Sequence, residues 1–217
     1  MEVIDLSQKL EQGMDVYPGA PEPTFEQWQS VEDGDVYQLI KFSMTTHTGT
    51  HLDCNTHVCK EGYYTDNQDV GFFIGKGLVL DCRKYDYNEI IGMEIFDDVD
   101  LEGVNFIFIY AGWDKKWGKN EFWQGYPYIS KEVAEFIRDN KSIRGIGLEY
   151  ACLDPDDQPT LDLHKIVLSE EKTVIENLTN LDKLYGKNFT FIGLPLKFKK
   201  GEGSPIRAVA ILEGKEK

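Results

Sequence analysis

Apolar and polar residues follow one another in short runs along this chain, and the pattern predicts strands more often than helices. Residues 36–46 (VYQLIKFSMTT) are rich in β-branched and aromatic side chains, which favours a strand that ends just before His47. Several later runs are almost continuously apolar, as expected for strands buried on both faces. We expect these strands at residues 77–81 (GLVLD), 105–110 (NFIFIY), 144–149 (RGIGLE), 188–194 and 205–212 (PIRAVAIL).

Helical periodicity is confined to two segments. Residues 131–140 carry Val133, Phe136 and Ile137 at spacings of three and four, and Ser130 before them is a suitable N-cap. A second helix is expected at residues 180–185, ended by Gly186. The segment 106–149 therefore has the order strand, helix, strand, and no linker or repeat interrupts the chain. We predict a mixed α/β fold built on a large sheet, forming a single domain over residues 1–217.

The stretch HTGTHLDCNTH, residues 47–57, holds three of the four histidines in the chain. A helix that places His47 and His51 on one face is disfavoured, because Thr48, Gly49 and Thr50 lie between them. In a loop, Gly49 would instead let the backbone turn tightly, so that both imidazoles and Asp53 point inward. Two histidines and a carboxylate suit a divalent cation such as zinc or manganese.

The simpler alternative is that these histidines are only hydrogen-bonded structural residues. Three of them with an aspartate between the second and third favour a metal site over that alternative. His57 could be a third nitrogen ligand or a proton carrier beside the metal, and spacing alone does not choose. His164 is the fourth histidine and could complete the same cluster, with Glu170, Glu171 or Glu176 as the accompanying carboxylate.

Composition narrows the function further. With 38 acidic residues against 23 basic ones, the net charge of −15 repels phosphate backbones and anionic lipids, so we expect no nucleic-acid or membrane partner. The N-terminus lacks a secretory signal pattern and no run is apolar enough to span a bilayer, which favours a cytoplasmic location. We expect the four scattered cysteines to be reduced thiols.

Motifs of other chemistries are missing from the sequence. It contains no GxSxG, no GxxxxGK[ST] and no GxGxxG. Tyr17-Pro18-Gly19 is interpreted as a turn and Ser204 as a turn residue, while Trp113, Trp117 and Trp123 are expected in the core more than in a pocket wall.

HTGTHLDCNTH closely resembles the HxGTHxDxPxH motif of the cyclase-like metal-dependent hydrolase family, which includes bacterial kynurenine formamidase (arylformamidase) and isatin hydrolase. The resemblance covers nearly the whole chain. Segments that look like family segments, in family order, are DVYPGAP at 15–21, YAGWD at 110–114, GYP at 125–127, GIGLEYACLDP at 145–155, and His164 followed by IENLTNLDKL at 175–184.

The resemblance implies a β-rich α/β domain of the swivelling β/β/α type, found as a dimer or higher oligomer, with two divalent ions per subunit. His57 matches the proton donor and acceptor, and Tyr17 falls where formamidases carry a tryptophan that lines the substrate pocket. Zn²⁺ is favoured over Mn²⁺. The residues that match family metal ligands are His47, His51, Asp53, His164 and Glu176, with Asp53 and Glu176 shared between the ions.

Three departures from the family pattern bear on the site. Asn55 replaces the motif proline, and Glu149 and Ala151-Cys152 stand where many relatives have an aspartate and a small hydroxyl residue. The resemblance implies a hydrolase that cleaves an aryl formamide such as N-formylkynurenine, an intermediate of tryptophan catabolism, through a metal-activated water. The alternatives are a cyclic-amide hydrolase like isatin hydrolase, and a metal-binding module without catalysis.

Overall fold

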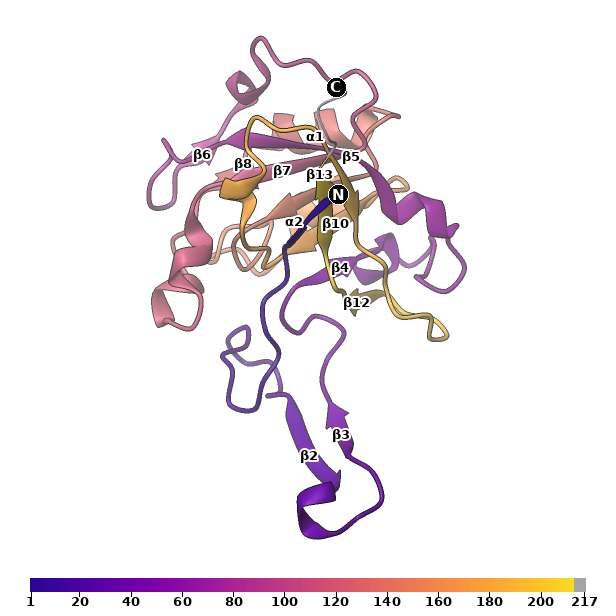
Figure 1. Cartoon of the computed structure of the whole chain (residues 1–217). Coiled ribbons are helices and arrows are strands. Elements are labelled where there is room, and N and C mark those ends of the chain that lie inside the picture. Colours follow the sequence, from indigo (N-terminus) through magenta and orange to yellow (C-terminus); the bar gives the residue numbers. More distant parts are fainter. Residues whose placement is uncertain (213–217) are drawn as a thin grey trace.

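The structure, a computed structural model, describes residues 1–212, so the last five residues of the predicted domain lie outside it. Its centre is a nine-stranded mixed sheet (Figure 1). In spatial order the strands are β1 (Glu2–Asp5), β13 (Val209–Leu212), β11 (Phe189–Ile192), β5 (Ile74–Asp81), β7 (Phe106–Tyr110), β9 (Gly145–Leu148), β10 (Thr173–Glu176), β4 (His51–Asp53) and β12 (Gly203–Pro205).

The four strands β5, β7, β9 and β10 run parallel in the middle of this sheet, and the strands on either side pair with them antiparallel. Both faces of the middle strands are covered. In β7, Phe106 and Phe108 belong to one core cluster, whereas Ile107 and Ile109 belong to the other. Successive side chains of a strand point to opposite faces, so the continuous apolar run FIFIY follows directly from this double burial.

Two α-helices occur in the described part of the chain, α1 (Lys131–Asp139) and α2 (Asp162–Val167). The predicted helix at 131–140 is confirmed, and the Ser130 hydroxyl caps it by accepting a hydrogen bond from the Val133 backbone N–H. Val133 and Ile137 are buried in the cluster that contains Ile107 and Ile109. Neither helix of residues 1–212 is long and apolar enough to cross a membrane.

Two small sheets complete the strands. The hairpin of β2 (Thr24–Gln29) and β3 (Leu39–Ser43) extends away from the large sheet, and β6 (Ile90–Ile91) pairs with β8 (Tyr128–Ile129) (Figure 1). Short 3₁₀ turns link these elements: η1 (Val31–Asp33), η2 (Asn55–His57), η3 (Val70–Phe73), η4 (Met93–Phe96), η5 (Trp113–Lys116), η6 (Asn120–Phe122) and η7 (Leu181–Lys183).

Several expected elements differ from those observed. The helix predicted at 180–185 is wrong: Asn180 has a left-handed backbone and only the 3₁₀ turn η7 follows it. The run 205–212 divides into β12 and β13, with Ser204 inside β12 and buried, so that residue is not in a turn. The strand predicted at 36–46 is shorter, since β3 covers only Leu39–Ser43, and it lies in the hairpin.

A candidate divalent-metal centre

The centre of the candidate site is the pairing of β4 with β10. His51 and Asp53 are two residues apart on β4, so their side chains share one face of the sheet. Glu176 on β10 lies directly opposite His51 in the antiparallel register. Directly opposed residues have Cβ atoms about 5 Å apart. The strand register therefore brings a histidine and two carboxylates together from segments that are far apart in sequence.

The turn before β4 contains Gly49, and its backbone orients the His51 ring. Gly49 adopts φ +64°, and a Cβ at this position would lie 2.4 Å from a methyl carbon of Leu10, so another residue would be strained and would have to displace the leucine side chain. The expected tight turn is thus confirmed, and residues 47–50 are not helical. The Gly49 carbonyl accepts a hydrogen bond from Nδ1 of His51 at 2.9 Å. A carbonyl can only accept, so Nδ1 of His51 carries a proton in this contact, and Nε2 is the nitrogen that faces the carboxylates and could bind a cation.

His164 reaches the same face from helix α2. Asp154 fixes its orientation: one carboxylate oxygen accepts from the His164 ring Nδ1 at 2.6 Å and from its backbone N–H at 3.0 Å. The other oxygen accepts from the Leu163 backbone N–H at 2.7 Å. Asp154 therefore caps the start of the helix and turns Nε2 of His164 toward Asp53 and Glu176, as the outer partners of metal-binding histidines do.

The ligand atoms fall into two sets that share both carboxylates. Nε2 of His51 lies 3.5 Å from Oδ1 of Asp53 and 3.4 Å from Oε2 of Glu176. Nε2 of His164 lies 3.4 Å from Oδ2 of Asp53 and 3.2 Å from Oε1 of Glu176. Ligands about 2.1 Å from a tetrahedral zinc ion are about 3.4 Å apart. The distances from each histidine to the two carboxylates are thus those expected between ligands of one cation, and His51, Asp53 and Glu176 together form a group that could hold one.

One of the two buried carboxylates, that of Asp53, lacks within the described residues the hydrogen-bond partners that such groups normally have, whereas Glu176 accepts a hydrogen bond from the Leu153 backbone N–H at 2.8 Å. Among residues 1–212, neither oxygen of Asp53 receives a hydrogen bond of good geometry, although three imidazole nitrogens lie 2.7 to 3.5 Å away. Asp53 is 1% exposed and Glu176 5%. Buried charges are paired or coordinate metals. The arrangement therefore fits a divalent cation better than it fits an apolar core.

The charges of the cluster reinforce this conclusion. Burial raises the pKa of Asp53, but the positive charges of His47 and His51 outweigh it and hold that pKa well below its usual range. Burial likewise raises the pKa of Glu176, and hydrogen bonds from His164 and His51 reverse the shift and lower it. Burial lowers the pKa of His47, and the charge of Asp53 overcomes that effect and raises it to about 9. Both carboxylates are thus anions.

His47 and His57 lie side by side next to this cluster. Nδ1 of His47 is 2.7 Å from Oδ1 of Asp53, and the centroids of the His47 and His57 rings are 4.2 Å apart. His57 ends the 3₁₀ turn η2, which begins at Asn55. The Asn55 side chain accepts a hydrogen bond from the Tyr63 backbone N–H at 2.9 Å. The asparagine therefore fixes this loop by a hydrogen bond where the family motif uses a proline.

All these groups open into one cavity of about 430 Å³. Tyr17 and Trp123 stand in its wall with their rings edge to face at a centroid distance of 6.3 Å. The turn expected at Tyr17 is confirmed by a hydrogen bond from the Ala20 N–H to the Tyr17 carbonyl. The expectation that Trp123 belongs to the core rather than to a pocket is wrong in part, because its half-buried ring also faces the cavity. The remaining apolar lining comes from Val16, Ala20, Ala151, Pro155, Pro159 and Leu161.

Every predicted site residue lines this cavity, and of the three candidate glutamates only Glu176 does. His47, His51, Asp53, His57, His164, Glu176 and Tyr17 all line it, whereas Glu170 and Glu171 are exposed elsewhere.

Sequence reasoning did not assign a role to Asp154, Glu202 or Cys152. Glu202 lies 3.3 Å from Nε2 of His47, and the Cys152 thiol lies close to both His164 and Asp154. All four cysteines are free, as expected. The only hint in the sequence that Asp154 contacts His164 is that the two lie ten residues apart, and such a spacing does not predict a contact.

Fold and cluster together define a sheet-rich α/β protein with a buried cluster of histidines and carboxylates that could hold a metal ion. The chain belongs to the family described as "Putative cyclase", whose sequence profile matches residues 4–155. It is 32% identical to a kynurenine formamidase of Bacillus cereus over 209 residues, which cover 96% of each chain. It is 30% identical to that of Geobacillus thermodenitrificans, over 94% of this chain and 95% of the relative.

Solved structures agree on the fold. Isatin hydrolase A from Labrenzia aggregata superposes with a TM-score of 0.87 at 24% identity, covering 96% of this chain and 93% of that one. A predicted metal-dependent hydrolase from Bacillus stearothermophilus gives 0.77 at 20% identity, over 96% and 97% of the two chains. The predicted fold class is therefore confirmed. The extent of the domain over residues 1–217 stays a prediction.

Proposed function

We propose that this protein is a metal-dependent hydrolase that cleaves the amide bond of an aryl formamide of the N-formylkynurenine type. One observation carries the proposal: His51 and His164 each face one oxygen of Asp53 and one of Glu176 at 3.2 to 3.5 Å. Relatives about 30% identical over almost the whole chain are kynurenine formamidases, which supports the reaction class.

In this proposal the chain holds two cations, zinc or manganese. His47, His51 and Asp53 hold the first and His164 the second, while Asp53 and Glu176 are shared. When bound, divalent ions would lower the pKa of a coordinated water to about 7 and polarise a carbonyl oxygen. Carboxylates and imidazoles together suit either zinc or manganese. Cys152 beside His164 adds a soft donor on the second side, which favours zinc.

The protein's own side chains then position the substrate and move the proton. His57 lines the cavity and takes no part in the four contacts of His51 and His164 with the two carboxylates, so its ring is available to carry a proton to the departing nitrogen. Tyr17 and Trp123 offer aromatic surfaces to the aryl ring. A cavity of about 430 Å³ has room for a one-ring or two-ring substrate.

The test couples metal analysis to a substrate panel. Protein loaded with Zn²⁺ or Mn²⁺ is assayed on N-formylkynurenine, isatin and an aryl lactone, with an Asp53→Asn variant as the matched control. We expect about two ions per chain and fastest turnover of the formamide, both lost in Asp53→Asn. Preferred opening of isatin would favour the cyclic-amide alternative. Two bound ions with no hydrolysis of any substrate would favour a metal-binding module.

The proposal also covers the substrate class, the oligomeric form and the cellular location. We infer a small-molecule amide as substrate, a homo-oligomer as the working form and the cytoplasm as its location. Acidic composition supports the absence of a nucleic-acid partner, since the net charge is −15.

A further inference from the structure

Asn177 follows Glu176 directly and lies in the wall of the metal cavity. Its backbone adopts φ +59°, in the left-handed region that asparagine tolerates and glycine prefers. The side chain crosses from the end of β10 to the turn before β4. There its Nδ2 donates a hydrogen bond to the Gly49 carbonyl at 2.8 Å. The end of one strand therefore holds the backbone at the start of the other.

This contact fixes the orientation of the Asn177 amide. With the amide turned over, Oδ1 would face the Gly49 carbonyl oxygen, and both atoms are acceptors. Oδ1 is buried and has no hydrogen-bond partner among residues 1–212. A buried acceptor without a partner lowers stability. The donor end of this side chain, rather than its oxygen, is therefore the part that acts on the site.

The Gly49 carbonyl accepts from two donors, and the second is His51. Nδ1 of His51 donates to the same oxygen at 2.9 Å, and Nδ2 of Asn177 lies 3.5 Å from that ring nitrogen. Gly49 has no side chain to restrict the rotation of its peptide groups. If its carbonyl turned away, the proton of the neutral His51 ring could move to Nε2, and a protonated Nε2 does not bind a cation.

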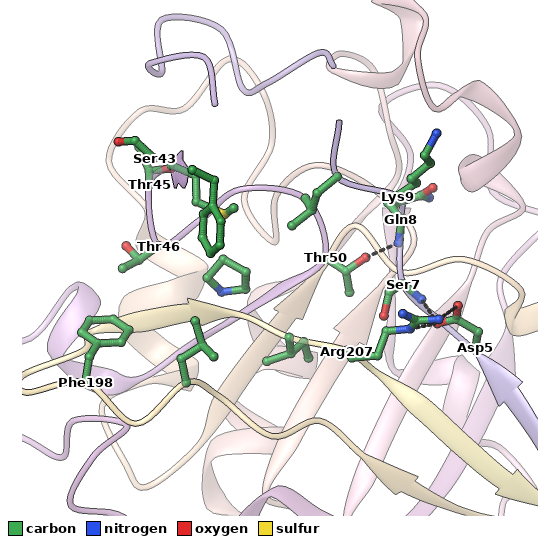
Figure 2. A pocket seen from close by; sticks show the side chains of 16 residues that line it. Asp5, Ser7, Gln8, Lys9, Ser43, Thr45, Thr46, Thr50, Phe198 and Arg207 are labelled. Carbon is green, nitrogen blue, oxygen red and sulfur yellow. Dashed lines mark hydrogen bonds and ion pairs between the residues drawn. The ribbon is translucent and has the colours of Figure 1, made fainter. Parts of the chain in front are cut away.

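Thr50 joins the same two segments at a second point. Its hydroxyl donates to the Asn177 carbonyl at 2.7 Å and accepts from the Gln8 backbone N–H at 2.8 Å. Figure 2 shows the contact with Gln8, where both residues line a groove of about 900 Å³. The Asn177 side chain thus binds the backbone of Gly49, and the Thr50 side chain binds the backbone of Asn177.

Burial makes both hydrogen bonds hard to replace. Thr50 is 2% exposed, His51 3% and Asn177 3%. A buried group that loses its partner bears the cost of its lost hydration, because water does not reach it to form a substitute hydrogen bond. The contacts of 2.7 and 2.8 Å also have the length of well-formed hydrogen bonds. The Gly49 peptide is therefore held from both sides of the turn.

We propose that Asn177 and Thr50 are positioning residues that hold the Gly49 peptide and thereby keep the proton of His51 on Nδ1. Nε2 of His51 is then left for the cation. The inference rests on the proposed function, in which His51 is a metal ligand. Partners that orient a metal-binding histidine typically change metal affinity or activity by about 10- to 100-fold.

The first test is Asn177→Gly, which suits the left-handed backbone and removes only the amide. Asn180→Gly is the matched control, because Asn180 has φ +62° and its side chain donates to the Asp5 carbonyl instead. Long-range ¹H–¹⁵N NMR of the metal-free chain reports which nitrogen of His51 carries the proton. We expect Nδ1 in the wild type and in Asn180→Gly, and a mixture of the two tautomers in Asn177→Gly.

Zinc affinity is measured on the same three proteins by competition with a chelator. Asn177→Gly is expected to bind zinc about 10- to 100-fold more weakly than the wild type, and Asn180→Gly to match the wild type. Melting curves show whether each variant is folded.

A second pair of variants tests the hydroxyl of Thr50. Thr50→Val keeps the shape of the side chain and removes the hydroxyl, so it is expected to shift the His51 tautomer and weaken zinc binding. Thr50→Ser keeps the hydroxyl and is expected to restore both. If the two residues act as one unit, the double variant Thr50→Val with Asn177→Gly loses less affinity than the sum of the single losses.

An Asn177→Gly protein with the wild-type tautomer and zinc affinity would overturn the proposal. So would an equal loss in Asn180→Gly, or a Thr50→Ser protein that behaves like Thr50→Val. A wild type that binds no zinc would refute the proposed function instead. The tautomer is measured without metal, so it would still decide whether Asn177 and Thr50 orient the His51 ring.

Discussion

Glu149 offers a quantitative test of how the sheet edge beside the site is built. It follows β9 and is fully buried, with one carboxylate oxygen accepting backbone N–H bonds from Ala111 at 3.1 Å and Gly112 at 2.7 Å. The other oxygen has no hydrogen-bond partner among the described residues. Burial, helped by the negative charge of Asp114, raises the pKa of Glu149 from 4.5 to about 8.

The sign of the pH effect follows from this shift. Between pH 4.5 and 8 the folded chain keeps a proton on Glu149 that the unfolded chain has lost, so the free energy of unfolding falls as pH rises. Each pKa unit corresponds to about 1.4 kcal/mol. The full penalty above pH 8 is therefore at most about 5 kcal/mol, of which about 3 kcal/mol develops between pH 6 and pH 9.

Replacing Glu149 by Gln keeps an oxygen for the two N–H donors and removes the charge. We measure the free energy of unfolding in urea at pH 6 and at pH 9. Between these two pH values it should fall by up to about 3 kcal/mol less in Glu149→Gln than in the wild type. Glu61→Gln, at an exposed glutamate, should retain the wild-type loss. His47, with its pKa raised to about 9, also lowers stability as pH rises, but equally in all three proteins. A Glu149→Gln protein whose stability falls as steeply as the wild type's would refute the reasoning.

Four further predictions concern the site and its scaffold. His57→Ala should lower kcat by about 10²- to 10⁴-fold at unchanged metal content, and normal turnover would contradict its role as proton carrier. Asp53→Asn should reduce bound metal below two ions per chain by elemental analysis, because it removes a charge that both sets of ligands share. Trp123→Ala should raise KM about 2- to 12-fold for an aryl formamide but not for an alkyl one, by steady-state kinetics. Ser130→Ala should lower the free energy of unfolding by about 1 kcal/mol in a urea titration, since it removes the N-cap of α1.

The core strands could be predicted because a strand that is buried on both faces has an almost continuously apolar sequence. The runs GLVLD and NFIFIY correspond to β5 and β7, whose side chains pack on both faces of the sheet. The segment 205–212 is apolar almost throughout, and that pattern predicts one strand. The structure divides it, because β12 pairs with β4 at one edge of the sheet and β13 pairs with β1 and β11 near the other. No local pattern encodes that crossing.

The failed helix at 180–185 has a related cause. Leu181 and Leu184 have helical spacing and are buried, but their environment is set by the packing of the loop after β10. Asn180 at φ +62° starts a single 3₁₀ turn there. Helix α2 was not predicted, because its sequence lacks the helical spacing that residues 180–185 have. Its six residues are too few for a periodic pattern, and Asp154, eight residues before its start, caps it.

The candidate site was predictable where its residues are contiguous. HTGTHLD places His51 and Asp53 on one face of a strand, and Gly49 permits the turn before it. The choice of Glu176 over Glu170 and Glu171 depends on which residue faces His51 across the sheet, and the register decides it. Asp154 and Glu202 act through contacts with His164 and His47 that only the folded chain creates.

In the proposed metal centre, His51 and His164 share Asp53 and Glu176 through a pair of divalent ions. The most direct measurement is anomalous diffraction at the zinc edge from crystals grown with zinc. We expect two peaks in the cavity, one beside His51 and one beside His164, with both carboxylates between them. A cavity with no peak, or zinc bound only at residues away from Asp53 and Glu176, would contradict it.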